Sequence, residues 1–191
     1  YGAKLSETHY KNGIQDGLET TWYGTSDGSS GKRESEVYYK NGKEEGLQTW
    51  WYESGRKKDE WHFKNGQFDG LFNGWYKSGV KKYTYYVKNR QKEGLVTYWY
   101  ESGKKNYEIP YINGKPEGLS TTWWKNGTKK EEEHYKNGRK DGVMKEWYKS
   151  GKKKSIKHLK NGIENGVRKE WDEDGTLTYE GNYIDGGEEI K

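Results

Sequence analysis

Apolar and polar residues recur along this chain with a fixed spacing of 24 positions. The segment from Gly46 to Asp69 has Leu47 directly after its first Gly and Trp51 five places after it. The pattern also begins, with Leu or Val after the Gly, at the following positions: Gly17, Gly70, Gly94, Gly118, Gly142 and Gly166. A fixed period of this length is typical of repeat proteins, in which each unit packs against its neighbours.

Two glycine-containing turns divide each unit into runs of six to eight residues. One turn is Glu53-Ser54-Gly55 and the other is Asn65-Gly66. Asn-Gly and Ser-Gly tolerate the positive φ of tight hairpin turns, and runs of this length favour strands over helices. We therefore predict an all-β fold, an elongated single-layer antiparallel meander of about seven 24-residue β-hairpin repeats.

The length of the first turn decides which side chains share a face of the sheet. A two-residue turn would place Leu47 opposite His62. A three-residue turn, with its glycine in a left-handed bulge, would place Trp51 opposite Lys57 and Leu47 opposite Trp61. Because a slip of one residue moves every side chain to the other face, we predict the three-residue turn. One face would then carry the columns of Leu47, Trp51 and Phe63, and the other those of Tyr52, Lys58, Glu60 and His62.

The repeats cover nearly the whole chain, so we predict a single repeat array over residues 1–191. Residues 1–16 form a partial repeat, and an insertion lies within residues 24–30. The full repeats start at residues 17, 46, 70, 94, 118, 142 and 166. Tyr1 opens the chain in the middle of a repeat, as a processed or trimmed start would.

Composition restricts how such a sheet is stabilised. Hydrophobic residues make up 28% and charged residues 34% of the chain, while 16% is aromatic, with 10 Trp and 18 Tyr. Large rings bury much area with few residues, which supports a thin layer rather than a thick core. The chain has no cysteine, and no apolar run approaches the ~18 residues of a membrane span. We expect no cofactor.

Candidate catalytic and metal-binding residues give little support to an enzyme. The segment from Gly24 to Gly28 matches G-x-S-x-G, but it is an insertion in a hairpin, whereas the hydrolase motif requires a following helix. All four histidines occupy one repeat column, so even those one repeat apart would be ~10 Å from each other, too far to share a zinc ion. We predict that the protein is not an enzyme and has no metal site.

The unit reads Tyr-Lys-Asn-Gly, then Gly-Leu, Trp-Tyr and Gly-x-Lys-Lys, and residues 179–186 begin Tyr-Glu-Gly. This sequence resembles the bacterial form of the MORN repeat variant family, over nearly all of the chain. The resemblance implies consecutive β-hairpins used for protein interaction, scaffolding or membrane-lipid association. It supplies no catalytic residues. Some bacterial members carry an antitoxin label and others are exported, which favours an exported or cell-surface location over a cytoplasmic one.

The candidate binding residues are the aromatic residues and lysines that recur in each repeat. The aromatic face of a one-layer sheet is not wholly covered by its own chain, and exposed apolar surfaces often bind partners. The lysines after the Ser-Gly turns line one edge, where they would assist. We predict a scaffold that binds a protein partner or a second copy of itself. The predicted binding residues are Trp51, Trp75, Trp99, Trp123, Trp147, Tyr52, Tyr76, Tyr100, Lys57, Lys81, Lys105, Lys129 and Lys153.

The sequence leaves two other functions open. The rhythm Trp-Tyr-x-x-x-Gly is similar to choline- and glucan-binding repeats, and the lysine edge suits an anionic membrane, so a glycan- or membrane-binding module is one alternative. An antitoxin-like partner of a toxin is the other, and it follows from the family resemblance alone. Nucleic acid is disfavoured, because the net charge is only +5 and acidic residues such as Glu60 and Glu108 lie near the lysines.

Overall fold

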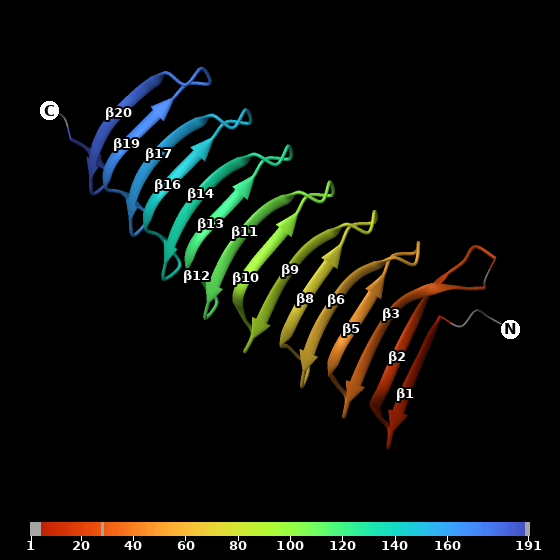
Figure 1. The fold of residues 1–191 in the computed structure, drawn as a ribbon. Helices are drawn as coiled ribbons and strands as arrows, with labels where there is room; N and C mark the ends of the chain where they lie inside the picture. The colour runs from red at the N-terminus through yellow and green to blue at the C-terminus, as the bar shows by residue number, and fades with distance from the viewer. Residues whose placement is uncertain (1–4, 28, 190–191) are drawn as a thin grey trace. The chain divides into compact units, whose positions relative to one another are not determined.

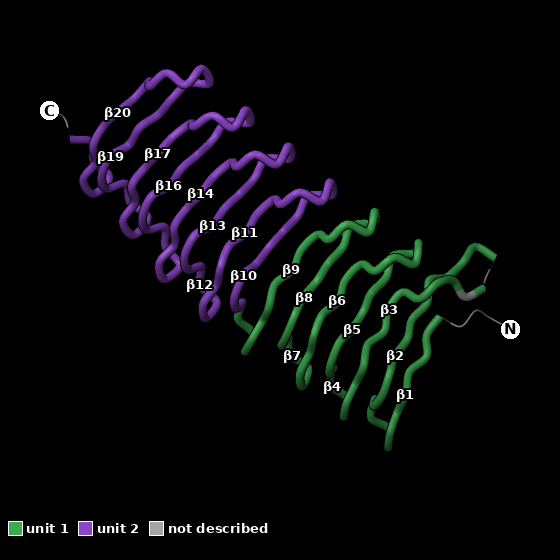
Figure 2. The backbone as a smooth tube through the Cα atoms, in the orientation of Figure 1, with its two compact units in different colours: residues 1–91 green, residues 92–191 purple. Residues whose placement is uncertain are grey.

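The computed structural model describes residues 5–27 and 29–189, and every helix or strand in these ranges is a β-strand. The chain divides into two compact units, residues 1–91 and residues 92–191 (Figure 2). Within each unit, consecutive strands lie side by side in one antiparallel layer (Figure 1). The predicted all-β meander of hairpins is therefore confirmed. In the described residues, no helix could cross a membrane.

Unit 1 is a meander in which each long strand pairs with the next one along the chain. Its long strands are β1 (Ser6–Lys11), β2 (Ile14–Gly24), β3 (Ser30–Lys40), β5 (Gly46–Trp51), β6 (Lys57–Lys64), β8 (Gly70–Trp75) and β9 (Lys81–Lys88). Two short strands, β4 (Lys43–Glu44) and β7 (Gln67–Phe68), follow Asn-Gly turns and pair with β3 and β6.

Unit 2 repeats this arrangement with the same strand lengths in most hairpins. Its long strands are β10 (Gln91–Trp99, whose first residue ends unit 1), β11 (Lys105–Ile112), β13 (Gly118–Trp123), β14 (Lys129–Lys136), β16 (Gly142–Trp147), β17 (Lys153–Lys160), β19 (Gly166–Trp171) and β20 (Leu177–Ile184). The short strands are β12 (Lys115–Pro116), β15 (Arg139–Lys140), β18 (Ile163–Glu164) and β21 (Gly187–Glu188).

The Asn-Gly turns are two-residue hairpin turns. Lys64 pairs with Gln67, and the intervening Asn65 and Gly66 have φ of 51° and 75°. Two successive positive φ values define the type I′ turn, whose twist matches that of the paired strands. Arg90, which stands where the other repeats have Gly, adopts a φ of 64°. The turn conformation therefore persists even where its usual glycine is absent.

The Ser-Gly turn is the predicted three-residue turn. Gly55 has a φ of 86° and donates its N–H to the Tyr52 carbonyl at 2.7 Å. The Tyr52 N–H donates to the Arg56 carbonyl at 2.8 Å, which closes the hairpin. Trp51 lies opposite Lys57, as predicted. A positive φ at the turn glycine is what this geometry requires.

The predicted register is wrong beyond this turn. Leu47 lies opposite His62 and not opposite Trp61. The register shifts between Trp50 and Trp51, because β6 contributes one extra residue there and forms a β-bulge. The hairpins β8–β9, β10–β11, β13–β14, β16–β17 and β19–β20 contain the same shift.

This bulge places the two main apolar columns on opposite faces, which corrects the prediction that Leu47 and Phe63 share one. We call one side the leucine–tryptophan face. It carries Leu47, Thr49, Trp51, Glu60, His62 and their equivalents. We call the other side the cluster face. It carries Gln48, Trp50, Tyr52, Trp61, Phe63 and their equivalents.

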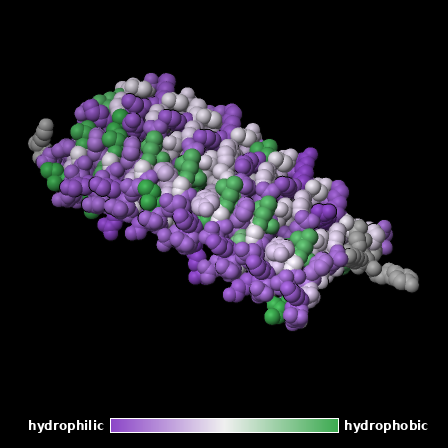
Figure 3. Space-filling view, turned by 60° about the horizontal axis from the view of Figure 1, so that its bottom comes forward, coloured by the Kyte–Doolittle hydropathy of each residue, from purple (hydrophilic) through white to green (hydrophobic). Residues whose placement is uncertain are grey.

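The hydrophobic core lies on the cluster face. The buried apolar residues, each at most 8% exposed, are Val37, Phe63, Phe72 and Val87 in unit 1 and Val96 and Ile109 in unit 2. In unit 1 their neighbours are rings, with the Trp50 and Trp61 centroids 4.5 Å apart. The leucine column of the other face is 43–51% exposed at Leu47, Leu71, Leu95 and Leu119. Figure 3 shows a surface where hydrophobic side chains recur singly among polar ones.

Candidate binding surface

Within each unit, the predicted tryptophans and lysines lie together at one end of the leucine–tryptophan face. In each hairpin the column tryptophan is directly opposite the column lysine. The pairs are Trp51–Lys57, Trp75–Lys81, Trp99–Lys105, Trp123–Lys129 and Trp147–Lys153. All five tryptophans are half-buried, so each indole offers only part of its surface to a partner.

Lysine–tryptophan contacts also link successive hairpins, and we call this arrangement the Trp–Lys ladder. The Lys57 ammonium lies 6.0 Å from the ring centre of Trp75, in the following hairpin. In unit 2 the same contact measures 5.5 Å for Lys105 and Trp123, 5.7 Å for Lys129 and Trp147, and 5.2 Å for Lys153 and Trp171. Ammonium groups at these distances are attracted to the ring face. The ladder therefore contributes to stacking of the hairpins.

Glutamates on the same face reduce the positive charge of the lysine column. Lys105 pairs with Glu108 at 2.9 Å, and Lys57 and Lys129 pair with the equivalent glutamates three residues along. Each exposed pair contributes only about 0–1 kcal/mol to stability. Their larger effect is electrostatic, because a paired ammonium attracts an anionic surface less strongly than a free one.

The predicted binding tyrosines mainly join one hairpin to the next. The Tyr52 hydroxyl donates to the Trp75 carbonyl at 2.7 Å, and the Tyr100 hydroxyl donates to the Trp123 carbonyl at 2.7 Å. Tyr76 occupies the same repeat position, and its ring centre lies 5.7 Å from the Lys82 ammonium. The hydroxyls of Tyr52 and Tyr100 are thus used within the sheet.

A column of acidic residues holds the Asn-Gly turns, a role that the sequence analysis missed. Each carboxylate accepts the backbone N–H of the turn residue in the next hairpin. The contacts are Asp16–Asn41 at 2.9 Å, Glu45–Asn65 at 2.7 Å, Glu93–Asn113 at 2.9 Å, Glu117–Asn137 at 2.6 Å and Asp141–Asn161 at 3.0 Å. The available signal was an acid directly before nearly every repeat glycine.

The histidine column makes a second contact that joins neighbouring strands. His62 Nδ1 lies 2.8 Å from the Leu71 carbonyl, and His158 Nδ1 lies 2.8 Å from the Val167 carbonyl. Since a carbonyl only accepts, Nδ1 carries the proton and donates. His9 and His134 make the same contact. Within the described residues, no group of three His, Asp or Glu side chains could hold a metal ion.

Within the G-x-S-x-G segment, Gly24 ends β2 and residues 25–27 lie between β2 and β3. The Asp27 carboxylate accepts hydrogen bonds from the Thr25 hydroxyl and from the Ser29 N–H, the latter at 3.0 Å. These bonds lower the pKa of Asp27 to about 2. Gly28, the last residue of the motif, lies outside the described residues. The acid is thus engaged by its own loop.

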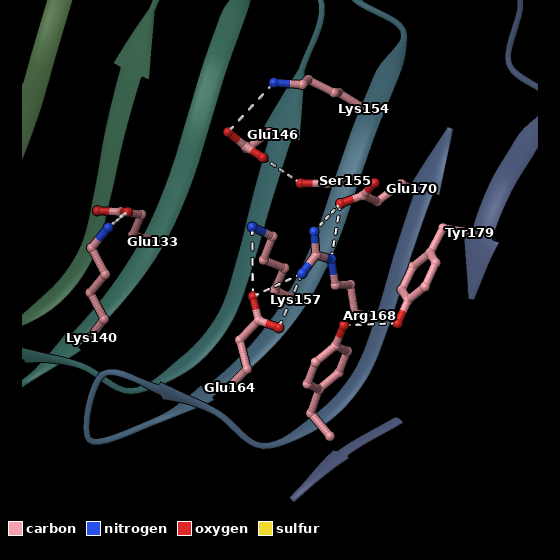
Figure 4. Close-up of polar contacts among 11 residues, drawn as sticks. Glu133, Lys140, Glu146, Lys154, Ser155, Lys157, Glu164, Arg168, Glu170 and Tyr179 are labelled. Atoms are coloured by element: carbon pink, nitrogen blue, oxygen red, sulfur yellow. Dashed lines mark hydrogen bonds and ion pairs between the residues drawn. The ribbon is translucent and has the colours of Figure 1, made fainter. Parts of the chain in front are cut away.

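From β14 onward, the cluster face of unit 2 carries charged side chains that pair with one another (Figure 4). Unit 1 carries a cluster of rings on the same face. Glu133, only 8% exposed, pairs with Lys140 and accepts the Tyr135 hydroxyl at 2.7 Å. Further along, Arg168 pairs with Glu170 and Glu164. Buried charges are tolerated only when paired in this way. The two units therefore present different chemistry on equivalent surfaces.

Stacked hairpins with the same side-chain contacts every 24 residues define a β-hairpin repeat protein. Comparison with protein-family models matches the MORN repeat variant at residues 44–65, 92–113, 116–137, 140–161 and 164–185, more than half of the chain. The chain therefore belongs to the MORN repeat variant family. A comparison with curated proteins finds no match.

Proposed function

We propose that this protein is a non-enzymatic scaffold that binds a protein partner through its leucine–tryptophan face. The observation that carries the proposal is the exposed leucine column beside the Trp–Lys ladder. Leu47 is 48% exposed and Leu71 43% in unit 1, while Leu95 is 51% exposed and Leu119 43% in unit 2. Membership of the MORN repeat variant family agrees with a scaffold role.

The leucine column is a candidate binding surface because its exposed leucines recur from one hairpin to the next. A single exposed leucine is ordinary on a protein surface. Here the same position is exposed in successive hairpins of unit 1, at Leu47 and Leu71, and of unit 2, at Leu95 and Leu119. Successive hairpins within a unit lie ~10 Å apart because each contains two strands. A partner with apolar residues at matching intervals would bury several leucines at once. Interfaces commonly gain most of their affinity from a few such well-packed contacts.

The pairing of lysines with glutamates supports a protein partner over an anionic membrane. A membrane-binding surface relies on lysines that remain available to lipid headgroups. On this face Lys57, Lys105 and Lys129 each pair with a glutamate of their own strand. An antitoxin-like role would be a special case of protein binding, in which the captured partner is a toxin.

Substitution of the leucine column tests the proposal. We expect that changing Leu47, Leu71, Leu95 and Leu119 together to Thr, which suits an exposed strand, lowers capture of the partner at least about tenfold. Affinity capture with mass spectrometry identifies the partner, and sedimentation detects self-association if the partner is a second copy. Leucine is a better target than tryptophan, because the indoles also take part in the ladder.

The matched control replaces Ile112 and Ile163, each 52% exposed but outside the leucine column, with Thr. This control should capture the partner as well as the unmodified protein does. Equal capture by the folded leucine variant would contradict the proposal. Binding to vesicles that contain anionic lipid tests the membrane alternative in the same experiment. Salt-sensitive vesicle binding with no captured protein would favour the membrane alternative.

A further inference from the structure

Trp124 is an unusual residue in its repeat column. The equivalent position holds Tyr in five other repeats and Asp172 in the last. The Trp124 indole N–H donates to the Trp147 carbonyl at 3.1 Å, a contact that a tyrosine hydroxyl makes in other hairpins. The larger ring is thus anchored at one edge by the usual bond. The ring is half-buried and also borders a cavity.

A cavity of about 270 Å³ adjoins this ring, near the Ser-Gly-type turns of unit 2. Trp124, Trp147 and Tyr148 line it together with charged side chains that include Lys130, Lys149 and Glu146. Sites for small molecules typically combine an apolar wall with a few polar groups, in volumes of roughly 300–1,000 Å³. At about 270 Å³ this cavity lies just below that range, so it suits a ligand no larger than a single sugar ring.

Charged groups at the cavity indicate which ligand it would accept. The ammonium groups of Lys130 and Lys149 lie 5.0 and 5.9 Å from the centre of the Trp124 ring. Lys154 also lines the cavity, as do the carboxylates of Glu146 and Glu173, so the lining carries three positive and two negative charges. The net positive charge favours an anion. Glu146 accepts the Ser155 hydroxyl at 2.6 Å, which positions its carboxylate to accept further hydrogen bonds.

We propose that this cavity binds one acidic sugar residue, such as a hexuronic acid within a polysaccharide. The C–H face of a pyranose ring packs on the flat apolar face of an indole. Its carboxylate would pair with the ammonium of Lys130 or Lys149, and its hydroxyls would donate to Glu146. None of the exposed leucines lines the site, so it is separate from the leucine column, although Trp147 of the Trp–Lys ladder forms part of its wall.

NMR titration of the full chain tests this proposal. The ligand is a tetrasaccharide of alternating glucuronic acid and N-acetylglucosamine, and the neutral control is a tetrasaccharide of N-acetylglucosamine alone. We expect saturable shifts of the Trp124 indole N–H signal, with the neutral sugar bound at least about tenfold more weakly. Absence of saturation with the acidic sugar, or equal affinity for the neutral one, would overturn the proposal.

Three variants locate the binding. Trp124→Tyr introduces the residue that is common in this repeat column, and the signal that disappears in this variant is that of the Trp124 indole. We expect the variant to bind the acidic sugar about tenfold more weakly or worse, as measured from the signals of other residues that line the cavity. Lys130→Gln should remove most of the preference for the acidic sugar. Lys82→Gln is the matched control, because Lys82 faces Tyr76 in the equivalent position of unit 1. Unchanged affinity in both cavity variants would place the sugar elsewhere and refute the site.

Discussion

At the scale of single residues, the carboxylates that hold the Asn-Gly turns explain how one hairpin positions the next. The N–H of the turn residue points away from its own hairpin and needs an acceptor. Glu117 supplies one to Asn137 at 2.6 Å, and the neighbouring Gly138 N–H donates to the Pro116 carbonyl at 2.9 Å. Two adjacent turns are therefore joined by one side-chain and one backbone hydrogen bond.

Removing a turn carboxylate should loosen the turn that follows it. Glu117→Ala leaves the Asn137 N–H without its charged acceptor, so we expect a loss of about 1 kcal/mol in the free energy of unfolding. Hydrogen exchange of the Asn137 amide should become faster. Urea unfolding and NMR measure the two effects, with Glu101→Ala, in an exposed turn, as the control. Unchanged exchange at Asn137 would show that the carboxylate is not needed.

The carboxyl groups of Glu131 and Glu133 form a second notable residue pair. They lie two positions apart on the cluster face of β14. Burial, together with the hydrogen bond to Glu133 and the charge of Glu133, raises the pKa of Glu131 to about 7. Burial disfavours the charge of Glu133 as well, but hydrogen bonds from Glu131, Lys140 and Tyr135 outweigh it and lower its pKa. Near neutral pH the two residues thus share one proton.

This pair should make stability depend on pH. The unfolded chain releases the Glu131 proton near its ordinary pKa of 4.5, whereas the folded protein retains it until about pH 7. The stabilisation is therefore complete below pH 4.5 and is lost as the pH rises through 7. After allowance for solvent screening, we expect a change on the order of 1 kcal/mol.

Glu131→Gln mimics the protonated side chain. The raised pKa of Glu131 predicts that the free energy of unfolding falls between pH 5 and 8, and this variant should remove most of that fall. Urea unfolding at a series of pH values measures it, with Glu101→Gln as the control. A variant that keeps the full slope would exclude Glu131 as its source. Glu133 acts in the opposite direction, because its lowered pKa contributes stability that is lost under acid conditions.

At the scale of the hairpin, the close approach of successive strands depends on the repeat glycine. Gly70 has a φ of 129°, and an added Cβ would lie 2.6 Å from the Cβ of His62 in the preceding strand. Gly46 also has a positive φ, of 77°, but an added Cβ there would meet nothing within 4 Å. Gly70 therefore combines backbone strain with a steric clash, whereas Gly46 has backbone strain alone.

Gly70→Ala should destabilise the protein more than Gly46→Ala. Both variants place a Cβ at positive φ, which costs about 1–2 kcal/mol. Only Gly70→Ala also forces His62 to move, and we expect this to add at least about 1 kcal/mol. Urea unfolding of the two variants gives the difference. Equal losses would mean that the strands adjust without cost.

The hairpin is also where prediction from sequence succeeds and then fails. The turn residues determine φ locally, so Asn65-Gly66 and the left-handed Gly55 could be predicted. The bulge beside Trp51 could not, because the extra residue is a lysine in a run of basic residues and leaves no mark in the apolar pattern. The hydrogen bonds of Glu117 and its equivalents join separate hairpins, which propensities within one hairpin cannot reveal.

At the scale of the whole molecule, the same scaffold carries two kinds of surface. Contacts that join hairpins recur in both units, including those of the tyrosine hydroxyls and the turn carboxylates. The cluster face instead varies, from the Trp61 and Phe72 rings of unit 1 to the Arg168 network of unit 2. The 24-residue period could be predicted from the sequence. The difference between the cluster faces of the two units could not, because the predicted register assigned residues to the wrong faces.

The carboxylates of Glu93, Glu117 and Asp141 each face the turn of the hairpin that follows, so this class of contact has a direction along the chain. In such a series, a hairpin provides a carboxylate for the turn of the following hairpin, and its own turn N–H donates to the carboxylate of the preceding one. Between the turns at Asn113, Asn137 and Asn161, a gene segment that encodes 24 residues can therefore be duplicated or deleted with each of these carboxylates still facing a turn. Lineages could lengthen or shorten these proteins by unequal recombination, while selection alters the variable face one hairpin at a time.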